Sequence, residues 1–550
     1  MRLTSRTWDF ALHTDDHLLS ELLVDAGQRY HSRPALIFPD ARLTYSELSA
    51  LSQRYARAML GHGISRGDHV GILATNRIEY VPLLFACMMC GAVAVLLNAR
   101  FRVQELRHAV NKCDLKWLFA GQSEGVPHID RLREALPSLQ DIGESGIAVV
   151  PGTPRLERVI ALDAVDGIGL TALTKFLQED KQADQGQLEQ RRREIIAAEP
   201  ALIIFTSGTT SLPKGCELSQ ESVFKPSLAM RNRLSLRSDE RIWDPLPMFH
   251  MAAILPMLSL FHDGGAYVTD EKFDADRAIQ QITQEAATFL YPAFPAIMSE
   301  IVKHPDFDLT AMRHVRLINN VAAAEALQNN MRIWPTATHI SAYGMTELSG
   351  IASHTDPDDT PGQRAETCGN PYDDVEVMIV DQETGKPCNQ GQKGEICVRG
   401  FLLFLGYYGQ PEETAKVMDD HGWFHTGDMG SLDPEGRILF HGRIKDMLKV
   451  GGENVSPLEI EGWLEQHPAV LVAQVVGAPD SRLDEVVAAF IQLKPGVNVE
   501  AQELIDFCGG QIASFKVPRV VRFVTEWPMS ATKIQKSVLR ETLVAELPAT

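Results

Sequence analysis

A short apolar segment that ends in a loop of hydroxyl groups constrains the fold of this chain most. Residues 201–205 (ALIIF) are uniformly apolar, and residues 206–211 (TSGTTS) carry five hydroxyl groups and one glycine. The apolar run predicts a buried strand of a parallel sheet. N–H groups and hydroxyls at a strand end, with Lys214 close behind, suit the oxygens of a polyphosphate. A surface turn would have a similar composition, and the Walker spacing of a phosphate-binding loop is absent.

Three further segments give this loop its meaning. They are SAYGMTELSG at 341–350, WFHTGD at 423–428 and GRIKDMLKVGGENVSPLEIE at 442–461. Together with FTSGTTSLPKG at 205–215, they resemble the motifs of the adenylate-forming superfamily of acyl-CoA ligases, luciferases and non-ribosomal adenylation domains. The resemblance extends from about residue 44 to about residue 540, with the motifs in the family's order.

The resemblance implies an α/β fold in two parts. A large multi-lobed N-terminal domain over residues 1–442, with mostly parallel sheets flanked by helices, would precede a small mobile α/β domain over 443–550. The active site would lie in the cleft between them. Helical and strand patterns alternate along the chain, which also favours layered α/β architecture.

Local patterns support this division. Residues 44–47 (TYSE) form a capping box at the start of a predicted helix. Residues 437–441 are expected to be the last strand before the boundary near residue 442. Beyond it, segments 470–476, 486–493 and 520–524 are strand candidates. Five apolar residues share one face of a predicted helix: Ala501, Leu504, Ile505, Cys508 and Ile512.

The overall charge narrows the choice of partners. The 550 residues contain 52 basic and 72 acidic side chains, a formal net charge of −20. Such a balance disfavours nucleic acid and anionic membranes as partners. A bound nucleotide would need local positive charge, for which Lys214, Arg443 and Lys533 are the candidates.

Residues 81–97 are uncharged and apolar, which raises the question of a membrane span. Pro82 and Gly91 interrupt the segment, so a buried helix followed by a central strand is the better prediction. Cys87 and Cys90 form a C-x-x-C pair inside it, but no second pair completes a zinc site. The N-terminus lacks the apolar stretch of a signal peptide. The expected protein is cytoplasmic and has no integral membrane segment.

The resemblance implies a two-step reaction with ATP, Mg²⁺ and coenzyme A. A carboxylate attacks the α-phosphorus of ATP and expels pyrophosphate, and a thiol then attacks the acyl-adenylate. Orientation of substrates and neutralisation of phosphate charge supply most of such catalysis. The phosphate loop would comprise Thr206 as a catalytic residue, Ser207, Gly208, Thr209, Thr210 and Lys214. Ser211 stands where the family usually has glycine.

Residues 343–347 match the adenine and magnesium motif. The resemblance implies that Tyr343 stacks on adenine, with Gly344 beside it, that the Thr346 hydroxyl meets the α-phosphate, and that Glu347 holds Mg²⁺. A hard cation prefers carboxylate oxygen, so the chemistry agrees. The alternative is a turn before a helix that Thr346 caps.

The resemblance also assigns residues around the domain boundary. Asp428 would accept the ribose hydroxyls, and Arg443 would reach the same ribose. Lys445 would be the hinge about which the C-terminal domain swings between the two steps. Gly451 and Gly452 would let the backbone approach the pantetheine arm of CoA closely.

Lys533 is the best match to the lysine that bridges the substrate carboxylate and the α-phosphate. The family usually has one more residue, commonly glycine, between the preceding threonine and this lysine. The shortened loop makes the reach of Lys533 the open point of the catalytic scheme.

The acyl site is defined by His250, which matches a catalytic family position beside the acyl group and the thiol entry. A histidine after phenylalanine in an apolar stretch is otherwise an ordinary core residue. Small and apolar residues at the positions that match the family's acyl site favour a bulky apolar acid, as in fatty acid metabolism. They are Ala252, Ala253, Ala322, Ala323, Ala324, Met251, Tyr291, Phe294 and Met345. Val321 replaces a glycine of the relatives. No spare charge for an α-amino group is apparent.

The predicted function is therefore an ATP-dependent acyl-CoA ligase for an apolar monocarboxylic acid, whose partners are small molecules. Two alternatives remain open from the sequence. The chain could load the phosphopantetheine of a carrier protein, or it could bind nucleotide as a degenerate regulator without catalysis. A homodimer is also left open.

Overall fold

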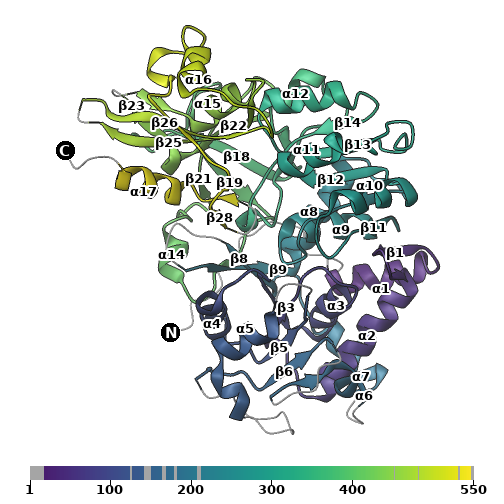
Figure 1. Ribbon diagram of the computed structural model, residues 1–550. Helices are drawn as coiled ribbons and strands as arrows, with labels where there is room; N and C mark the ends of the chain where they lie inside the picture. Colours follow the sequence, from purple (N-terminus) through teal and green to yellow (C-terminus); the bar gives the residue numbers. More distant parts are fainter. Residues whose placement is uncertain are drawn as a thin grey trace.

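The computed structural model describes residues 18–123, 127–141, 150, 152–163, 169–178, 183–206, 212–450, 453–480, 482–530 and 533–546. Figure 1 shows the N-terminal residues in the lower lobe, the middle of the chain at the upper right and the C-terminal residues at the upper left.

The lower lobe contains an eight-stranded sheet in the order β20-β9-β8-β4-β3-β5-β6-β7. Strands β8 to β7 of this order run parallel, whereas β9 and β20 are antiparallel additions. The strands are β3 (His69–Leu73), β4 (Val93–Leu97), β5 (Trp117–Ala120), β6 (Arg158–Ala161), β7 (Thr171–Ala172), β8 (Pro200–Thr206), β9 (Lys214–Ser219) and β20 (Gly406–Tyr407). The strand predicted at 201–205 is confirmed as β8, and all five of its predicted residues are buried.

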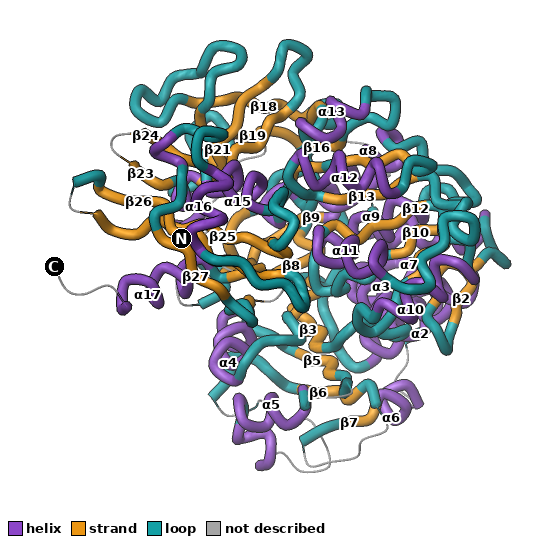
Figure 2. Tube along the Cα trace, turned by 45° about the horizontal axis from the view of Figure 1, so that its top comes forward, coloured by secondary structure: helices purple, strands orange, loops and turns teal. Residues whose placement is uncertain are grey.

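Helices cover both faces of this sheet (Figure 2). They are α2 (Tyr45–Gly61), α3 (Tyr80–Cys90), α4 (Val103–Lys112), α5 (His128–Ala135), α6 (Leu173–Gln178) and α7 (Gln185–Arg193). The predicted capping box is present, since Thr44 and Glu47 bond each other's backbone at the start of α2. The helix α1 (Leu19–Arg29) contacts α2 and α3.

The uncharged segment 81–97 forms a buried helix and a central strand, as predicted. Every residue of α3 and β4 is buried, and Gly91 ends α3 in the left-handed region with φ +67°. Within the described residues, no helix combines the length and the apolar character needed to traverse a bilayer. Burial raises the pKa of Cys87 to about 12, which agrees with a packing role for the C-x-x-C pair.

The upper right lobe contains a seven-stranded sheet in the order β14-β13-β12-β10-β11-β1-β2. Only β2 is antiparallel to its neighbour. Its strands are β1 (Pro34–Ile37), β2 (Arg42–Thr44), β10 (Arg241–Trp243), β11 (Ala266–Val268), β12 (Phe289–Ala293), β13 (Leu317–Asn320) and β14 (Thr338–Ile340). The accompanying helices are α8 (Gln220–Arg233), α9 (Met251–Phe261), α10 (Ala275–Gln284), α11 (Pro295–Lys303) and α12 (Ala324–Ile333).

Two small antiparallel sheets connect the lobes. One contains β15 (Ala342–Tyr343), β16 (Ser353–His354) and β17 (Asn370–Pro371). The other has the order β18-β19-β21-β22, with β18 (Val375–Val380), β19 (Gly394–Gly400), β21 (Phe424–Leu432) and β22 (Ile438–Arg443). The short helices α13 (Pro361–Glu366) and α14 (Pro411–Ala415) lie in the connections. The strand predicted at 437–441 corresponds to β22.

The C-terminal part has its own five-stranded sheet and core. The strands are β23 (Leu448–Val450), β24 (Glu453–Val455), β25 (Val470–Asp480), β26 (Asp484–Leu493) and β27 (Val520–Phe523). All three strand candidates in this part are thus confirmed. With helices α15 (Pro457–Leu464) and α16 (Ala501–Cys508), they enclose a cluster of buried residues drawn from 448–521. The helix α16 ends at Cys508, so Ile512 lies beyond it and not on its face, although Ile512 packs against the same core.

The chain ends in the hairpin β28 (Met529–Ser530) and β29 (Lys533–Ile534), followed by α17 (Lys536–Glu546). Figures 1 and 2 both place β23 on the outer side of the C-terminal part, away from β8 and β9. On the inner side, α15 approaches α12: a Cβ added to Gly462 would lie 3.4 Å from the Ala323 Cβ. The boundary at 442/443 stays a prediction.

Candidate active site

A buried carboxylate joins two of the predicted nucleotide-binding segments. Asp428 on β21 is 2% exposed, and its Oδ2 accepts a 2.8 Å hydrogen bond from the Tyr343 hydroxyl. The Arg443 Nε lies 2.9 Å from Asp428 Oδ1. Asp428 and Arg443 face each other in the register of β21 and β22. The structure thus brings together three residues that are 85 and 15 positions apart in the chain.

The surroundings of Tyr343 fix its ring and its protonation. Burial and the nearby Asp428 carboxylate raise the pKa of Tyr343 well above 10.0. The hydroxyl therefore stays protonated and donates a hydrogen bond to Asp428. The ring of Phe440 lies 6.0 Å away, centroid to centroid. Phe440 is 38% exposed whereas Tyr343 is 5% exposed, so the Phe440 ring is the half of this aromatic pair that is open to solvent and accessible to a planar ligand.

A bulge in β21 presents Asp428. Glu395 pairs with Met429 and Cys397 pairs with His425, so three residues of β21 face a single residue of β19. The Glu395 carboxylate accepts the N–H of Gly427 at 2.9 Å and bonds the His425 Nδ1 at 2.9 Å. Bulges re-aim side chains next to sites, and this one turns Asp428 toward Tyr343.

The hydroxyl of Thr426 closes the same bulge. It donates to the carbonyl of Ile396 at 2.7 Å and accepts the N–H of Asp428 at 3.1 Å. Sequence reasoning singled out Asp428 but missed Glu395 and Thr426 as its supports. The letters H-T-G-D held a signal for the bulge, since Gly427 has φ +70°, a conformation that favours glycine.

The segment after Tyr343 is tightly folded. A Cβ on Gly344 would lie 1.9 Å from the carbonyl oxygen of Gly350, so only glycine fits there. Thr346–Leu348 form a short 3-10 helix that begins after Met345, without a side-chain cap. The alternative in which Thr346 caps a helix is therefore wrong: Thr346 lies inside this turn, and its hydroxyl is not used as a cap.

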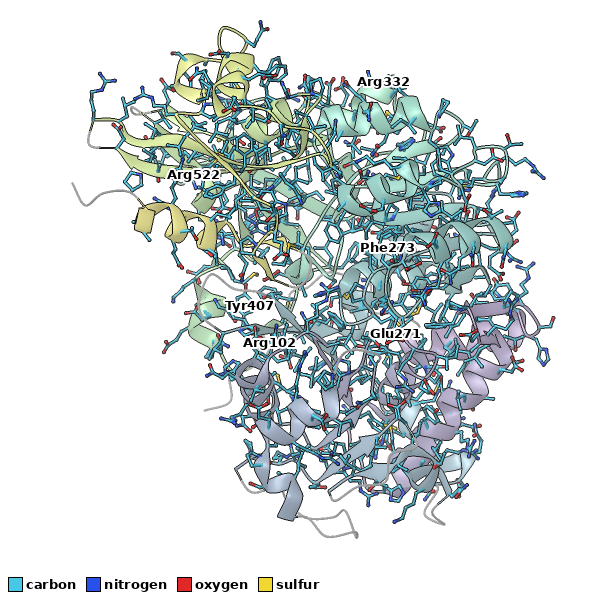
Figure 3. The ribbon with its side chains drawn as sticks, in the orientation of Figure 1. Arg102, Glu271, Phe273, Arg332, Tyr407 and Arg522 are labelled. Atoms are coloured by element: carbon cyan, nitrogen blue, oxygen red, sulfur yellow. The ribbon has the colours of Figure 1, made fainter. Side chains whose placement is uncertain are left out.

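The predicted magnesium ligand and the predicted phosphate lysine meet at one tyrosine. The Tyr407 hydroxyl on β20 donates to Glu347 Oε1 at 2.9 Å, and the Lys214 Nζ lies 4.9 Å from the centre of the Tyr407 ring. Burial and the Glu347 carboxylate raise the pKa of Tyr407, which keeps its hydroxyl a donor. Tyr407 lies in the middle of the molecule, between the lower lobe and the C-terminal part (Figure 3).

Lys214 has a second partner that the sequence did not suggest. Its Nζ lies 2.6 Å from Glu413 Oε2, at the side of α14. Hydrogen bonds from Lys214 and Lys416 lower the pKa of Glu413 to about 2, so the ion pair persists at neutral pH. Lys214 therefore reaches the loop region as a paired cation.

The predicted phosphate loop is only partly described. Thr206 ends β8 and pairs with Lys214 at the start of β9. The two residues therefore flank the loop that joins these strands. Ser207, Gly208, Thr209, Thr210 and Ser211 lie outside the described residues, as do Gly451 and Gly452. Their assigned roles stay predictions.

The backbone of the C-terminal part shows where the predicted hinge residue Lys445 and the predicted adenylation residue Lys533 lie. Lys445 is exposed in the short 3-10 helix Ile444–Asp446, directly after β22. Lys533 pairs with Ser530 in the β28–β29 hairpin. Figure 1 shows β28 on the inner side of the C-terminal part, at the level of β19 and β8. This hairpin therefore lies toward the middle of the molecule, whereas β23 lies on its outer side.

His250 begins the helix that connects the nucleotide segment to the apolar region. Its carbonyl accepts the N–H groups of Ala253 and Ile254 at 3.1 and 3.2 Å, at the first turn of α9. Gly350 packs on this helix: an added Cβ would lie 3.3 Å from the Met251 Cβ. The Tyr343–Gly350 segment and α9 are therefore in direct contact.

Six of the predicted acyl-site residues gather in one core. Met251, Ala253 and Tyr291 are buried in the cluster that also holds Tyr343, and Ala252, Phe294 and Met345 pack against it. Ala322, Ala323 and Ala324 are partly exposed and do not belong to this cluster. Val321 is 45% exposed at the end of β13, where its N–H donates to the Ala293 carbonyl at 2.8 Å. Ala293 itself has φ +54°, an uncommon conformation for a residue with a Cβ.

Polar atoms at the carboxyl end of β13 are deeply buried. Asn319 and Asn320 are 1% and 0% exposed. Within the described part of the chain, no hydrogen-bond partner reaches Asn319 Oδ1 or either amide atom of Asn320. Buried amides are costly without partners, and these lie at the carboxyl end of a strand, where ligands of open α/β sheets bind.

This geometry places a buried carboxylate beside an aromatic pair in a layered α/β fold. Comparison with known proteins gives the class of the protein. Residues 23–408 match the AMP-binding enzyme family, and residues 459–533 match the AMP-binding enzyme C-terminal domain. The chain belongs to this family, within the acyl-CoA ligase branch of the adenylate-forming superfamily, and is an AMP-forming acyl-CoA synthetase.

Named relatives extend over almost the whole chain. The putative acyl-CoA synthetase YngI of Bacillus subtilis is 33% identical over 537 residues, 95% of this chain and 96% of its own length. The mitochondrial medium-chain acyl-CoA ligase ACSF2 of Rattus norvegicus is 31% identical, over 97% of this chain and 89% of its own length. Because one relative is mitochondrial, the expected cytoplasmic location stays a prediction, as does a homodimer.

Solved structures share the fold. ATP-bound MatB from Rhodopseudomonas palustris superposes with a TM-score of 0.80 at 26% identity, over 96% of this chain and 99% of that one. The anthranilate CoA ligase AuaEII in complex with anthranoyl-AMP gives a TM-score of 0.83 at 26% identity, over 96% and 98%. The predicted fold class is confirmed.

Proposed function

We propose that the chain activates an apolar monocarboxylic acid of medium length as its acyl-adenylate and transfers the acyl group to CoA. In the first step a carboxylate oxygen bonds to the α-phosphorus of ATP, and the bond to pyrophosphate breaks. In the second step the CoA thiol, losing its proton, bonds to the acyl carbon, and AMP leaves.

The buried Asp428, held between Tyr343 and Arg443, carries the nucleotide half of this proposal. A carboxylate with two charge-assisted or strong hydrogen bonds is a fixed acceptor for the two ribose hydroxyls. Tyr343 and the half-exposed Phe440 offer an aromatic surface for adenine. Arg443, at the rim of the same site, supplies positive charge that the chain as a whole lacks.

The site fits a magnesium ion at Glu347. Its carboxylate is a hard oxygen ligand, and the Tyr407 hydroxyl bonds only one of its two oxygens, which leaves the other for a cation. Bound there, Mg²⁺ would neutralise phosphate charge as pyrophosphate departs. Thr206 and Lys214 lie at the ends of the loop proposed to hold the same phosphates.

Apolar packing supports the choice of acid. Small and apolar residues from α9 and β12 share one core with Tyr343, with His250 at the start of α9. The name of the rat relative, a medium-chain acyl-CoA ligase, favours a medium chain length. CoA as the acceptor is favoured by the names of both curated relatives.

We further propose that residues 443–550 rotate about Lys445 between the two steps. The β28–β29 hairpin with Lys533 lies on the inner side, which suits adenylation. The turn with Gly451 and Gly452 would replace it for the thiol step. Rotation is feasible because Lys445 is exposed in a single 3-10 turn and few dihedrals must change.

The test is pyrophosphate release with ATP, Mg²⁺ and saturated monocarboxylic acids of graded length, each with and without CoA. We expect release that peaks at medium length, and a thioester product only with CoA. An amino acid series serves as the control. Release that is indifferent to CoA would indicate a carrier-protein acceptor. ATP binding without release for any acid would overturn the proposal in favour of a nucleotide-binding regulator.

A further inference from the structure

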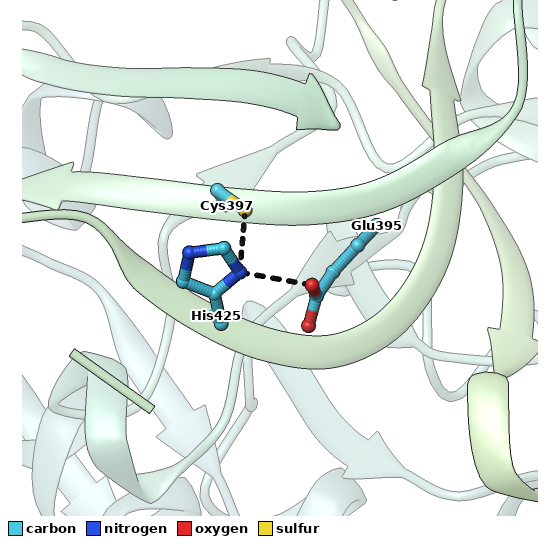
Figure 4. A group of neighbouring side chains, drawn as sticks. All are labelled: Glu395, Cys397 and His425. Atoms are coloured by element: carbon cyan, nitrogen blue, oxygen red, sulfur yellow. Dashed lines mark hydrogen bonds and ion pairs between the residues drawn. The ribbon is translucent and has the colours of Figure 1, made fainter. Parts of the chain in front are cut away.

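Three side chains of different chemistry converge on one face of the β18–β22 sheet. Glu395 and Cys397 are two residues apart on β19, so they share a face, and His425 lies opposite Cys397 on β21. Figure 4 shows the three side chains pointing toward one another. One ligand atom from each lies within 4.8 Å of the other two. In the described part of the chain, these are the three His, Cys, Asp or Glu side chains that lie close enough together to hold one metal ion.

The distances are close to those of a thiophilic metal site. His425 Nδ1 lies 3.4 Å from Cys397 Sγ and 2.9 Å from Glu395 Oε2. Tetrahedral zinc, with bonds of about 2.0–2.3 Å, separates its ligand atoms by about 3.4–3.6 Å. The Cys397–His425 distance already matches, and the Glu395–His425 distance needs to widen by about half an ångström, which rotation of one carboxylate supplies.

The surroundings resemble the second layer of a metal centre. His425 Nε2 lies 3.8 Å from Asp419 Oδ2, so a carboxylate faces the ring nitrogen that points away from Cys397. Ligating histidines usually have such a partner. Asp419 is held in turn, since its Oδ1 accepts the N–H groups of His421 and Trp423 at 2.8 Å each.

An ion can enter this cluster from solvent. The side chains of His425 and Glu395 are 32% and 19% exposed, while Cys397 is fully buried beneath them. One carboxylate, one imidazole and one thiol do not suit Mg²⁺, because Mg²⁺ selects oxygen ligands in octahedral geometry.

We propose that Glu395, Cys397 and His425 bind a divalent thiophilic cation of the zinc class, with Asp419 orienting His425 and water completing the coordination. The Cys397 thiol releases its proton to solvent as the sulfur–metal bond forms. The cation then lies between His425 Nδ1 and Glu395 Oε2; Nδ1 gives up its proton to solvent, and the neutral imidazole carries its N–H on Nε2, toward Asp419. This inference does not rest on the proposed acyl-CoA ligase activity.

The site is coupled to the nucleotide site through Glu395. Its Oε1 accepts the N–H of Gly427, next to Asp428, while its Oε2 faces His425. A cation that fixes Oε2 therefore also acts on the bulge that presents Asp428. We expect metal affinity and ATP affinity to change each other by the same factor, because such coupling is reciprocal.

The first experiment is titration of the full-length protein with Co²⁺, which reports thiolate ligation through a sulfur-to-cobalt charge-transfer band. We expect one equivalent to give the band and Zn²⁺ to displace it. Cys397→Ser should abolish the band. Cys388→Ser is the matched control, because Cys388 lies in the same region with its sulfur 3.7 Å from the Lys393 carbonyl, and it should retain the band.

A second variant tests the outer partner. Asp419→Asn should weaken Zn²⁺ binding by about 10- to 100-fold, the usual cost of losing such a partner. If Cys397→Ser does not fold, His425→Gln gives the answer instead: it should lose the Co²⁺ band while it keeps the thermal unfolding temperature of the natural sequence. Absence of a charge-transfer band, or a band that survives Cys397→Ser or His425→Gln in a folded protein, would each overturn the proposal.

Discussion

Replacement of Asp428 by asparagine tests the nucleotide site most directly. The amide keeps the shape of the carboxylate but removes its charge. In the free protein its oxygen must face the Arg443 Nε, which can only donate, and its nitrogen must face the Tyr343 hydroxyl. That hydroxyl then has to turn and accept, so the protein retains both contacts as weaker bonds and should remain folded.

The expected loss follows from the number of bonds to the ribose. Hydrogen bonds to a charged group contribute about 1.5–3 kcal/mol, against about 0.5–1.5 kcal/mol for neutral ones. Two ribose hydroxyls on Asp428 would therefore lose about 2–3 kcal/mol together. At about 1.4 kcal/mol per factor of ten, the KM for ATP should rise by about 30- to 150-fold.

The assay is pyrophosphate release at saturating acid over a range of ATP concentrations, with the thermal unfolding temperature as a check on folding. Asp263→Asn is the matched control, because Asp263 pairs with Arg231 through two bonds of 2.6 and 2.8 Å between α8 and the end of α9. That control should leave the KM for ATP unchanged. A folded Asp428→Asn protein with the KM of the natural sequence would refute the ribose assignment.

Three further results are expected. Lys533→Ala should abolish adenylate formation yet spare thioester formation from supplied acyl-adenylate; equal loss in both halves would remove Lys533 from its assigned role. Lys445→Pro should slow mainly the thioester step, because proline fixes φ and disfavours a helical residue before it. Lys445→Ala should leave the rates of both steps close to those of the natural sequence. An unchanged thioester step in the proline variant would exclude the hinge. Burial lowers the pKa of His339 from 6.5 to about 4, so between these pH values His339 is protonated in the unfolded chain but not in the folded protein, and stability is lost as the pH falls. Urea unfolding should show that the free energy of unfolding decreases by about 2–3 kcal/mol over this range. The decrease should be smaller in His339→Gln, whose amide still donates to the Trp334 carbonyl; an identical pH dependence in both proteins would contradict this account.

The supports of Asp428 show how a short motif depends on distant residues. Glu395 lies 32 positions before Gly427, and the two meet only because β19 and β21 pair with a bulge between them. The same bulge places His425 opposite Cys397, so one irregularity serves both the nucleotide site and the proposed metal site.

Several features were determined by the sequence alone. The apolar run 201–205, the capping box at 44–47 and the buried segment 81–97 each fold as predicted, because burial and capping are local properties of a few consecutive residues. The motif order was sufficient to indicate the family. Asp428, Arg443 and Tyr343 were also identified in advance, since each lies in a segment with a recognisable pattern.

Tertiary structure alone decided which side chains support that site. Tyr407 bonds Glu347, Glu413 pairs with Lys214, and Glu395 holds the bulge at Gly427. None of these three carries a local pattern of its own, because their roles arise from strand pairing between segments 30 to 200 positions apart. The sequence therefore specifies the groups that we propose contact substrate, whereas the antiparallel pairing of β9 with β20 and of β19 with β21 specifies what holds them in place.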